Sequence, residues 1–587
     1  MSVVHRLLTE HIDVWTAADT EKKSGRGRTS KSSGSVYGIK KLRDLILDLA
    51  VHGKLITQDE SDEPAVELFK RIQAKKTTLI SDGVIKKDKP LSPITENDAI
   101  FDIPERWHWV RLGDVCSYIQ RGKSPTYTDS SEFPVISQKC VRWNGLDLSQ
   151  ARFIDPNSIS KYEEIRLLRS GDILWNSTGT GTIGRACLVQ LTDLKQVLVA
   201  DSHVTVVRPI ILSNEYLWRW IQSPTVQTRI EAVASGTTNQ IELNTSAVIG
   251  HLCPLPPLAE QHRIVAKVDE LMALCDQLEA QHTDAAVAHE KLVSHLLSTL
   301  TQSQNAEDFS SNWQRIAAHF NTLFTTEASI DALKKTLLQL AVMGKLVPQD
   351  PRDEPARKLL RRIETEKAKI IAGNKKNRQL PPIKIEDQPF ELPLGWAWAR
   401  FPELGEFGRG KSKHRPRNDP KLFNPGVYPL VQTGEVARAD DVIDEYHSKY
   451  SDLGLAQSKI WPAGTLCITI AANIADSALL GFSACFPDSV VGFVPCQPIN
   501  DSKYFLTFMK TARENLLKFA PATAQKNINL EILESVLIPI PPLKEISRIV
   551  AKVDELTALC DQLKSRITDA NQLQQKLANV MVEQAVA

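Results

Sequence analysis

The sequence predicts an α+β fold in which two mixed, mostly β domains are joined by long antiparallel coiled-coil helices, with a pseudo-two-fold internal duplication. First, LRDLILDLAVHGKLITQDESDEPA, residues 42–65, recurs as LKKTLLQLAVMGKLVPQDPRDEPA, residues 333–356. Second, PLPPLAEQHRIVAKVDELMALCDQL, residues 254–278, recurs as PIPPLKEISRIVAKVDELTALCDQL, residues 539–563. Third, the stretches between these repeats hold short β-prone runs broken by Gly, Pro and Asn. The chain therefore contains two copies of one unit.

The long helices are predicted by apolar residues that follow a double proline at a spacing of 4, 3, 3 and 4, which is typical of one helix face. In the first copy these residues are Ile264, Val268, Leu271, Leu274 and Leu278, and in the second they are Ile549, Val553, Leu556, Leu559 and Leu563. Neither Pro nor Gly occurs from 258 to 300, so a helix of about 45 residues and roughly 65 Å is expected. One small domain cannot bury such a helix, so we expect the two copies to pair; the alternative is two separate surface helices.

Shorter repeated helices are predicted from Leu42 and Leu333, and each ends at a glycine, Gly53 or Gly344, suited to a left-handed C-cap. Upstream, His5 to Trp15 forms a short amphipathic element that is a candidate for docking on a partner. Residues 21–38 are rich in Ser, Gly and Lys and predict a flexible tether. These signals divide the chain into an N-terminal helix and tether (1–38), a helical repeat segment (39–92), a first insert (93–257), a central helical region (258–345), a helical linker segment (346–386), a second insert (387–542) and a C-terminal helix (543–587).

The two inserts begin alike and then diverge. Each opens with Pro-x-x-Trp-x-Trp, which contributes Trp107 and Trp109 or Trp396 and Trp398, and continues to a shared Arg-Gly-Lys-Ser. Beyond it the sequences differ: the first copy has WNSTGTGTIGRACLV where the second has ITIAANIADSALLGF. The shared parts predict a common mechanical task, and the inserts predict recognition of different targets. Because the tryptophans open both inserts whatever follows, a core or hinge role is favoured over stacking on bases.

Composition excludes few classes of protein. The 587 residues are 42% hydrophobic and 24% charged with a formal net charge of +1, which neither indicates nor excludes a nucleic-acid partner. No run of 18 apolar residues and no signal core occur, so we expect a cytoplasmic protein. Nine cysteines without a C-x-x-C pair predict reduced core residues rather than disulfides or a zinc site.

The sequence lacks the motifs that catalysis would need. Residues 405–412 fit the phosphate-binding pattern G-x-x-x-x-G-K-S, but Pro416 would break the helix that must follow it. No (N/D)-P-P-(Y/F) tetrapeptide of an amino-methyltransferase occurs. The repeated Asp269-Glu270 and Asp554-Glu555 indicate solvated helix faces rather than catalytic dyads. We therefore expect a chain that is not an enzyme and that holds neither a metal nor a cofactor.

The two repeats and the stretch WPAGTLCITIAANIADSALLGFSACFPDSVVGF resemble the specificity subunit of Type I restriction-modification systems, over nearly the whole chain from His11. The extended N-terminus and the long repeats are most similar to the subfamily with larger specificity subunits. The resemblance implies that each insert is a target recognition domain for one half of a split, asymmetric sequence in double-stranded DNA, with the paired helices as a ruler. It also implies two modification subunits that use S-adenosylmethionine, and restriction subunits that need ATP and Mg²⁺. Rival interpretations are a nucleotide hydrolase built on the Gly405 loop and a coiled-coil scaffold that does not bind DNA.

Candidate DNA-binding residues are polar or basic and lie in Gly-rich, turn-prone segments that can approach phosphates or base edges. In the first insert they are Arg121, Lys123, Tyr127, Gln138, Lys139, Arg142, Asn176, Thr178, Thr180, Thr237, Thr238, Asn239 and Gln240. In the second insert they are Arg409, Lys411, Lys413, His414, Arg415, Arg417, Gln432, Thr433, Gln525, Lys526 and Asn527. An ordinary solvated loop position is the alternative for each of them, and as a group at least half are expected on one face.

Overall fold

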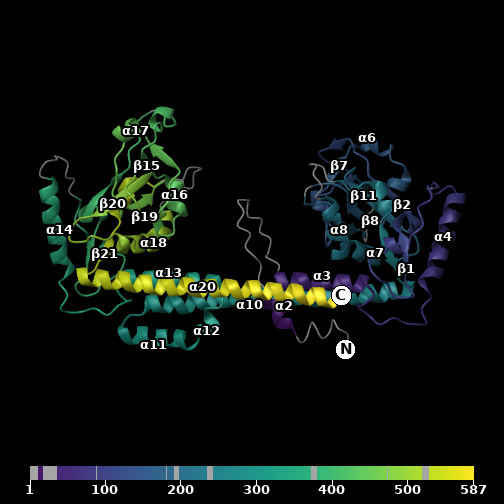
Figure 1. Ribbon diagram of the computed structural model, residues 1–587, viewed down its shortest axis with the longest axis horizontal. Helices are drawn as coiled ribbons and strands as arrows, with labels where there is room; N and C mark the ends of the chain where they lie inside the picture. Colours follow the sequence, from purple (N-terminus) through teal and green to yellow (C-terminus); the bar gives the residue numbers. More distant parts are fainter. Residues whose placement is uncertain are drawn as a thin grey trace. The chain divides into compact units, whose positions relative to one another are not determined.

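The protein forms two compact units in a computed structural model (Figure 1). The structure describes residues 11–17, 36–87, 89–179, 181–190, 197–234, 242–371, 380–414, 416–471, 473–518 and 528–586. Unit 1 contains residues 1–285 and 570–587, and unit 2 contains residues 286–569. No helix within the described ranges is long and apolar enough to cross a membrane.

Three helical segments form the base of unit 1. They are α3 (Tyr37–Val51), the first part of α10 (Leu258–Gln302) and the last part of α20 (Leu543–Val586). Their apolar side chains share one core cluster, to which α3 contributes Leu45, α10 contributes Val268 and Cys275, and α20 contributes Ala578. Tyr37 Oη also donates to Asn579 Oδ1 at 2.8 Å. The short α2 (Ile12–Ala17) and α4 (Ala65–Ser81) complete the helical part of this unit.

Unit 2 has an equivalent base, in which α20 takes the place that α10 has in unit 1 and α10 takes the place of α20. Here the last part of α10 and the first part of α20 pack against α13 (Glu327–Val342), through a cluster that includes Leu297, Leu337 and Cys560. Helices α11 (Ala306–Ala318) and α12 (Phe320–Leu323) also belong to this base, whereas the buried residues of α14 (Ala356–Ile371) join the core cluster of the lobe. Unit 1 holds the start of α10 with the end of α20, and unit 2 holds the reverse combination. The predicted antiparallel pairing is thus confirmed in each unit, with a third helix added.

The predicted helix boundaries hold, but one detail of the predicted apolar face is wrong. α10 runs for 45 residues and α20 for 44 without a break. Cys275 and Cys560 are buried where the spacing predicted Leu274 and Leu559, which are instead 43% and 48% exposed. The buried positions therefore continue the 4-3-4 spacing of a coiled-coil seam. Leu274 and Leu559 are thus exposed at equivalent positions of the two copies.

The globular lobe of unit 1 is built on two four-stranded sheets. The first has the order β2 (Cys116–Arg121), β11 (Val204–Pro209), β8 (Ile173–Asn176) and β9 (Ala186–Leu188). The second has the order β10 (Val199–Ala200), β4 (Pro134–Ile136), β7 (Arg152–Ile154) and β3 (Tyr127–Thr128), and β5 (Val141–Arg142) and β6 (Gly145–Leu146) form a separate hairpin. The helices of this lobe are α5 (Leu112–Val115), α6 (Pro156–Ile159), α7 (Asn214–Gln222), α8 (Pro224–Ala234) and α9 (Thr245–Ile249).

The lobe of unit 2 is built on one larger sheet. Its order is β14 (Gly405–Arg409), β20 (Val490–Pro495), β18 (Leu466–Thr469), β19 (Ser477–Leu480) and β16 (Val442–Ile443). A separate pair is formed by β15 (Tyr428–Leu430) and β17 (Ser448–Tyr450). The helices of this lobe are α15 (Phe401–Leu404), α16 (Thr433–Arg438), α17 (Asp452–Ala456), α18 (Lys503–Lys518) and α19 (Leu530–Ser535). Helix α18 packs between α13 and β19, as α7 packs between α3 and β9 in unit 1.

Each lobe is attached to its base by a two-stranded junction made from the repeated segments. In unit 1, β1 (His108–Arg111) pairs antiparallel with β12 (Leu252–Leu255), and in unit 2, β13 (Ala397–Ala399) pairs with β21 (Ile538–Ile540). The chain therefore enters and leaves each lobe side by side. Short 3₁₀ helices lie in the described connecting segments: η1 (Glu96–Asp98), η2 (Leu148–Gln150), η3 (Glu164–Arg166), η4 (Ile385–Asp387) and η5 (Pro420–Leu422).

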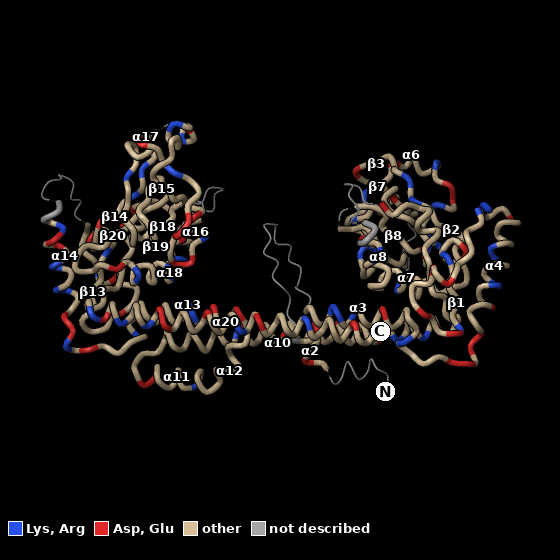
Figure 2. The backbone as a smooth tube through the Cα atoms, in the orientation of Figure 1, with Lys and Arg blue, Asp and Glu red and all other residues tan. Residues whose placement is uncertain are grey.

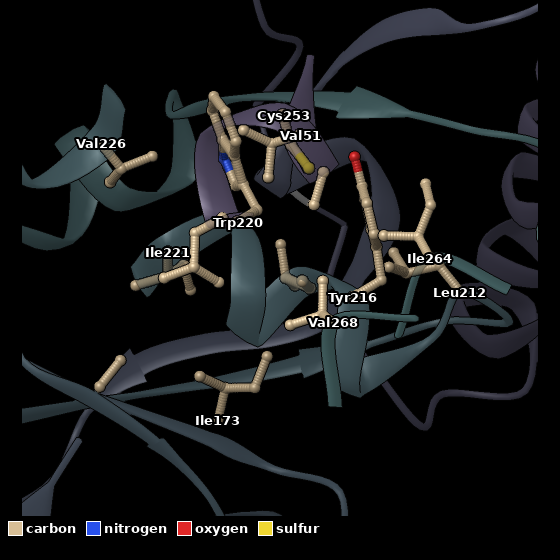
Figure 3. Packing of buried hydrophobic residues seen from close by; sticks show 14 of the residues in the cluster. Val51, Ile173, Leu212, Tyr216, Trp220, Ile221, Val226, Cys253, Ile264 and Val268 are labelled. Atoms are coloured by element: carbon tan, nitrogen blue, oxygen red, sulfur yellow. The ribbon is translucent and has the colours of Figure 1, made fainter. Parts of the chain in front are cut away.

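Trp107, Trp109 and Trp396 belong to the core, as predicted, whereas Trp398 is only partly buried and lies outside the core cluster. Trp107 Nε1 donates to Glu260 Oε2 at 3.0 Å, and Trp396 Nε1 donates to Glu545 Oε2 at 3.2 Å. Trp107, Trp109 and Trp396 are buried. Around the unit 1 junction, Trp220, Tyr216 and their aliphatic neighbours fill the space between helices and strands (Figure 3). These contacts recur in both copies and fix each lobe to its base.

The structure also bears on the predictions made for the N-terminal segment and for the cysteines. Trp15 of α2 is fully buried in the unit 1 core and packs on α3 of its own chain, so this residue is not a docking surface for a partner. Residues 21–35 of the predicted tether lie outside the described residues, and its last two residues, Tyr37 and Gly38, belong to α3, so the tether ends earlier than predicted. All cysteines are free thiols, and every one except Cys496 is buried, as expected for core residues.

Candidate nucleic-acid interface

The predicted polar residues gather where several strands of one sheet end. In unit 1, Arg121 pairs with Thr205, Asn176 with Val204, and Trp175 with Ala186, so these positions form a row across the end of the sheet. In unit 2 the corresponding row is made by the pairs Arg409 with Val491, Thr469 with Val490, and Ile468 with Ser477. We call the loops at this end of each sheet the strand-end surface. In unit 1 it comprises residues 121–128, 137–147, 176–179, 181–185 and 201–203, and in unit 2 residues 409–414, 416–419, 432–438, 469–471, 473–477 and 486–490.

Asn176 belongs to this surface by sequence but lies beneath it. Its side chain is fully buried, and Nδ2 donates to the Gln138 carbonyl at 3.1 Å. The prediction of direct DNA contact at Asn176 is therefore corrected, because a side chain without exposed area cannot reach a ligand. The residue instead ties the 137–147 loop to the 176–185 loop.

Arg121 and Tyr127 are already engaged within the lobe. Arg121 forms an ion pair with Glu242 and donates through Nη2 to the Leu243 carbonyl at 2.8 Å, which leaves its side chain 23% exposed. Tyr127 Oη donates to Asp201 Oδ2 at 2.6 Å, and burial together with this carboxylate raises the pKa of the phenol. The guanidinium of Arg152 stacks on the Tyr127 ring at 3.6 Å. Both residues brace the strand-end loops.

The other candidates of unit 1 that the structure describes lie at the surface. Thr178 Oγ1 lies 2.7 Å from His203 Nδ1, and Gln138 Oε1 accepts from Thr182 at 3.3 Å. Lys123 and Lys139 are exposed. Arg142 lies 3.5 Å from Asp147 and keeps 43% of its side chain exposed. The loops thus offer hydroxyl, amide and cationic groups from one end of the sheet, which are the groups that contact phosphates and base edges.

Two residues of this surface escaped the sequence prediction. Trp143, at the tip of hairpin β5–β6, is 44% exposed. Arg185 follows the Gly-rich loop and donates to the carbonyls of Val141 at 3.4 Å and Gly181 at 3.3 Å. The sequence did contain a signal, since Trp-Asn-Gly in a β-prone run is typical of a tight hairpin turn.

The basic run of unit 2 divides into paired and open cations. Arg409 Nε donates to the Asp488 carbonyl and Arg417 Nη2 to the Asp488 carboxylate, both at 2.8 Å. His414 Nε2 lies 2.8 Å from Asp419 Oδ2. Lys411 and Lys413 are exposed and have no ion-pair partner within the described ranges. Among the cations of this run that the structure describes, the two lysines are therefore open to a phosphate.

The amide and hydroxyl candidates of unit 2 join the same surface. Gln432 is the N-cap of α16, where its backbone N–H donates to Glu435 Oε2 at 3.0 Å. The Thr433 carbonyl accepts from Asn473 Nδ2 at 3.5 Å, which links α16 to the loop between β18 and β19. Nine candidates lie outside the described residues: Thr180, Thr237, Thr238, Asn239, Gln240, Arg415, Gln525, Lys526 and Asn527.

The phosphate-loop pattern folds as a strand. Residues Gly405 to Arg409 form β14, which pairs antiparallel with β20, and the Gly410 N–H donates to the Val490 carbonyl at 2.9 Å. These backbone N–H groups therefore serve the sheet and not a phosphate. A cluster of three or more His, Cys, Asp or Glu with metal-binding geometry is absent from the part of the chain that the structure describes.

Charges on the long helices are paired with their neighbours. Residues of both charges are scattered along the two helices (Figure 2). Asp269 pairs with Arg219 and Asp554 with Lys503, each at 2.7 Å, while Glu270 pairs with Lys267 at 2.8 Å. These acidic residues are solvated partners in ion pairs, as the sequence predicted.

Comparison with known proteins agrees with this architecture. A family model, the Type I restriction modification DNA specificity domain, matches residues 104–287 and again residues 393–572. The chain is 36% identical over 612 residues to the Type I restriction enzyme EcoEI specificity subunit of Escherichia coli, covering 99% of this chain and 100% of that protein. It is 35% identical over 614 residues to the EcoAI specificity subunit of the same organism, with 99% and 100% covered.

Among solved structures, a chain of a type I R-M system is 19% identical, with a TM-score of 0.47 and coverage of 83% of this chain and 99% of that one. The two family-model matches coincide with the two lobes and the first part of the helix that follows each lobe. The two curated relatives align over nearly the full length. The chain therefore belongs to the family of Type I restriction-modification specificity subunits.

Proposed function

We propose that the chain recognises a split, asymmetric sequence in double-stranded DNA, with each lobe contacting one half. The supporting observation is that both copies keep the same junction contacts but differ at the strand-end surface. Arg263 pairs with Asp62 and Arg548 with Asp353, both at 2.6 Å, in the shared parts. At the surface, the first copy has the β5–β6 hairpin and the second has helix α16. A constant attachment with different contact groups suits recognition of two unlike half-sites.

DNA contact at these surfaces would combine charge with hydrogen bonding. Exposed lysines such as Lys139, Lys411 and Lys413 suit phosphates, which supply most of the affinity in a salt-dependent way. Amide and hydroxyl groups such as Gln138, Gln432 and Thr178 suit base edges, where sequence is distinguished. The candidates outside the described residues remain part of this proposal.

The long helices are proposed to act as a ruler between the two lobes. Two half-sites on one face of DNA lie about one helical turn, roughly 34 Å, apart. Continuous helices of 45 and 44 residues hold a distance better than a loop does. Insertion of one helical turn after Ala280 and at the equivalent position in α20 is expected to lengthen the spacer by one or two base pairs and to leave both half-sites unchanged.

Catalysis is proposed to come from partner chains. Two modification subunits would use S-adenosylmethionine to methylate adenine N6, and restriction subunits would use ATP and Mg²⁺. This chain would hold none of these cofactors and would act in the cytoplasm. Exposed leucines at equivalent positions, Leu274 with Leu559 and Leu292 with Leu577, suit the docking of two copies of one partner.

The test is to express the chain with its modification subunit and to map N6-methyladenine in the host genome. We expect one bipartite motif with a fixed spacer and two different halves. Replacement of the first lobe by that of another family member is expected to change one half only. A contiguous motif, or methylation that does not depend on this chain, would contradict the proposal.

A further inference from the structure

The β5–β6 hairpin of unit 1 presents a large apolar ring to solvent. Trp143 is 44% exposed at the tip of this hairpin, in which Val141 pairs with Leu146 and Arg142 with Gly145. Its carbonyl accepts a hydrogen bond from Gln222 Nε2 at 2.8 Å, which anchors the tip to the end of α7. The ring is therefore exposed on a fixed support and does not belong to a core cluster.

Three cations lie close to the hairpin that carries this ring, and two of them, Lys139 and Arg185, have no ion-pair partner within the described ranges. Arg185 donates only to backbone carbonyls in the described residues, those of Val141 and Gly181. Burial and the neighbouring charge of Arg142 lower the pKa of Arg185. Lys139 is exposed on the 137–147 loop, which also carries Arg142. The acidic group at this loop is Asp147, which forms an ion pair with Arg142 at 3.5 Å. Positive charge without matching negative charge indicates an anionic ligand.

We infer that Trp143 is an apolar wedge that contacts a base step in the DNA groove, while Lys139, Arg142 and Arg185 contact the adjoining phosphates. This inference rests on the proposed function and assigns one of its contact groups. Apolar side chains at base steps partly unstack them, and flanking cations hold the backbone in place. Because every base has a π-face, a tryptophan in this position adds affinity with little dependence on base identity.

The wedge belongs to one copy only. Strand β4 leads into the turn and hairpin that carry Trp143, whereas in the second copy β15 leads into α16. Helix α16 runs from Thr433 to Arg438 and contains no aromatic residue. Loss of the wedge is therefore expected to weaken contact with one half-site and to leave contact with the other unchanged.

The test measures binding of the full chain with its modification subunits to three duplexes. One carries the motif found by methylation mapping, and the other two each have one half-site scrambled. Trp143→Ala is expected to weaken binding to the intact duplex roughly tenfold, and Trp143→Phe to stay near the wild type, because stacking on one base is worth that much. Trp313→Ala is the matched control, since Trp313 is 39% exposed on α11 of the other unit.

A second readout reports the base step itself. With 2-aminopurine placed at successive positions of the first half-site, wild-type complexes are expected to show increased fluorescence at one position, and Trp143→Ala complexes are not. Wild-type affinity for Trp143→Ala, or a loss equal to that of Trp313→Ala, overturns the wedge. Equal binding of the wild type to intact and scrambled duplexes contradicts the proposed function instead, so the two failures are distinct.

Discussion

Lys564 of α20 donates to Asp331 of α13 at 2.8 Å in unit 2, and at the equivalent positions of the first copy the two charges are exchanged. There Glu279 of α10 takes the place of Lys564, and Lys40 of α3 takes the place of Asp331. Crossed pairing of α3 with the first part of α20, or of α13 with the first part of α10, would bring like charges together at this contact. The exchange therefore favours the pairing of each short helix with the first part of the long helix of its own copy.

Reversing one of these charges is expected to destabilise unit 2 by about 0.5–1 kcal/mol, the range of a partly exposed ion pair. Lys564→Glu puts a second carboxylate beside Asp331, and Asp331→Lys in the same chain restores opposite signs. A double-mutant cycle from urea unfolding measures the coupling between them. Lys576→Glu on the exposed part of the same helix is the control. A double variant no more stable than the sum of its single variants would contradict the pairing role.

Gly53 and Gly344 are predicted to resist substitution for two reasons. Both have φ of +70°, and a Cβ at Gly53 would lie 2.5 Å from Pro104 Cγ. Gly53→Ala is expected to lower the free energy of unfolding by about 1 kcal/mol for the left-handed conformation and by more for the clash. Gly83→Ala is the matched control, because Gly83 also has φ of +70° but has open space around it. If thermal unfolding shows that both variants lose the same amount of stability, the clash with Pro104 does not contribute to the loss at Gly53.

Most of the fold was predicted from the internal repeat, because segments that occur twice in the chain are expected to have the same structural role in each copy. An interval without Pro or Gly predicted α10 almost to the residue, and Gly53 and Gly344 marked helix ends that need a left-handed residue. Which side of the helix is buried depends on the neighbouring helices, so Cys275 replaced Leu274 in the core. Periodicity alone does not resolve adjacent positions on a broad apolar face.

The candidate site was predicted less well because its strands are short. Several strands contain two to four residues, so pairing with distant segments decides which side chains point outward. Asn176 and Thr178 stand two residues apart, yet the first is buried in the sheet end and the second is only partly covered. Trp143 was missed since an aromatic residue in a β-prone run is usually a core residue.

Glu260 is predicted to make the stability of unit 1 fall as pH rises. Burial raises the pKa of this carboxyl above its ordinary value of 4.5. The folded state therefore binds the proton more tightly than the unfolded chain, and stability is lost as pH increases from the unfolded pKa through the raised folded pKa. Glu260→Gln, which can still accept from Trp107 Nε1, is expected to flatten the profile of unfolding free energy in this window. Glu270→Gln, at an exposed ion pair, is the control, and a steeper profile in Glu260→Gln would contradict the assignment.

Lys411 and Lys413 are predicted to contact phosphates and not bases. Their replacement by Ala is expected to weaken binding to all DNA sequences alike and to reduce the slope of log affinity against log salt by about 0.9 for each contact. Affinity measured over a salt series checks this for the intact and scrambled duplexes. Lys552→Ala is the control, because its ammonium pairs with Glu555 at 2.9 Å on α20. A changed motif in methylation mapping would instead assign these lysines to base recognition.

Leu274 and Leu559 are predicted to dock the modification subunits, since each is about half exposed at the same position of a repeated helix. Replacement of both by Asp is expected to abolish assembly of a complex with two modification subunits, because burying a charge at an apolar interface is strongly unfavourable. Each single replacement is expected to leave one subunit bound. Analytical ultracentrifugation gives the stoichiometry, and binding of DNA by the isolated chain should not change. Replacement of Val84, which is 55% exposed beyond the end of α4, by Asp is the control. Full assembly by the double variant would place the docking surface elsewhere on the helices.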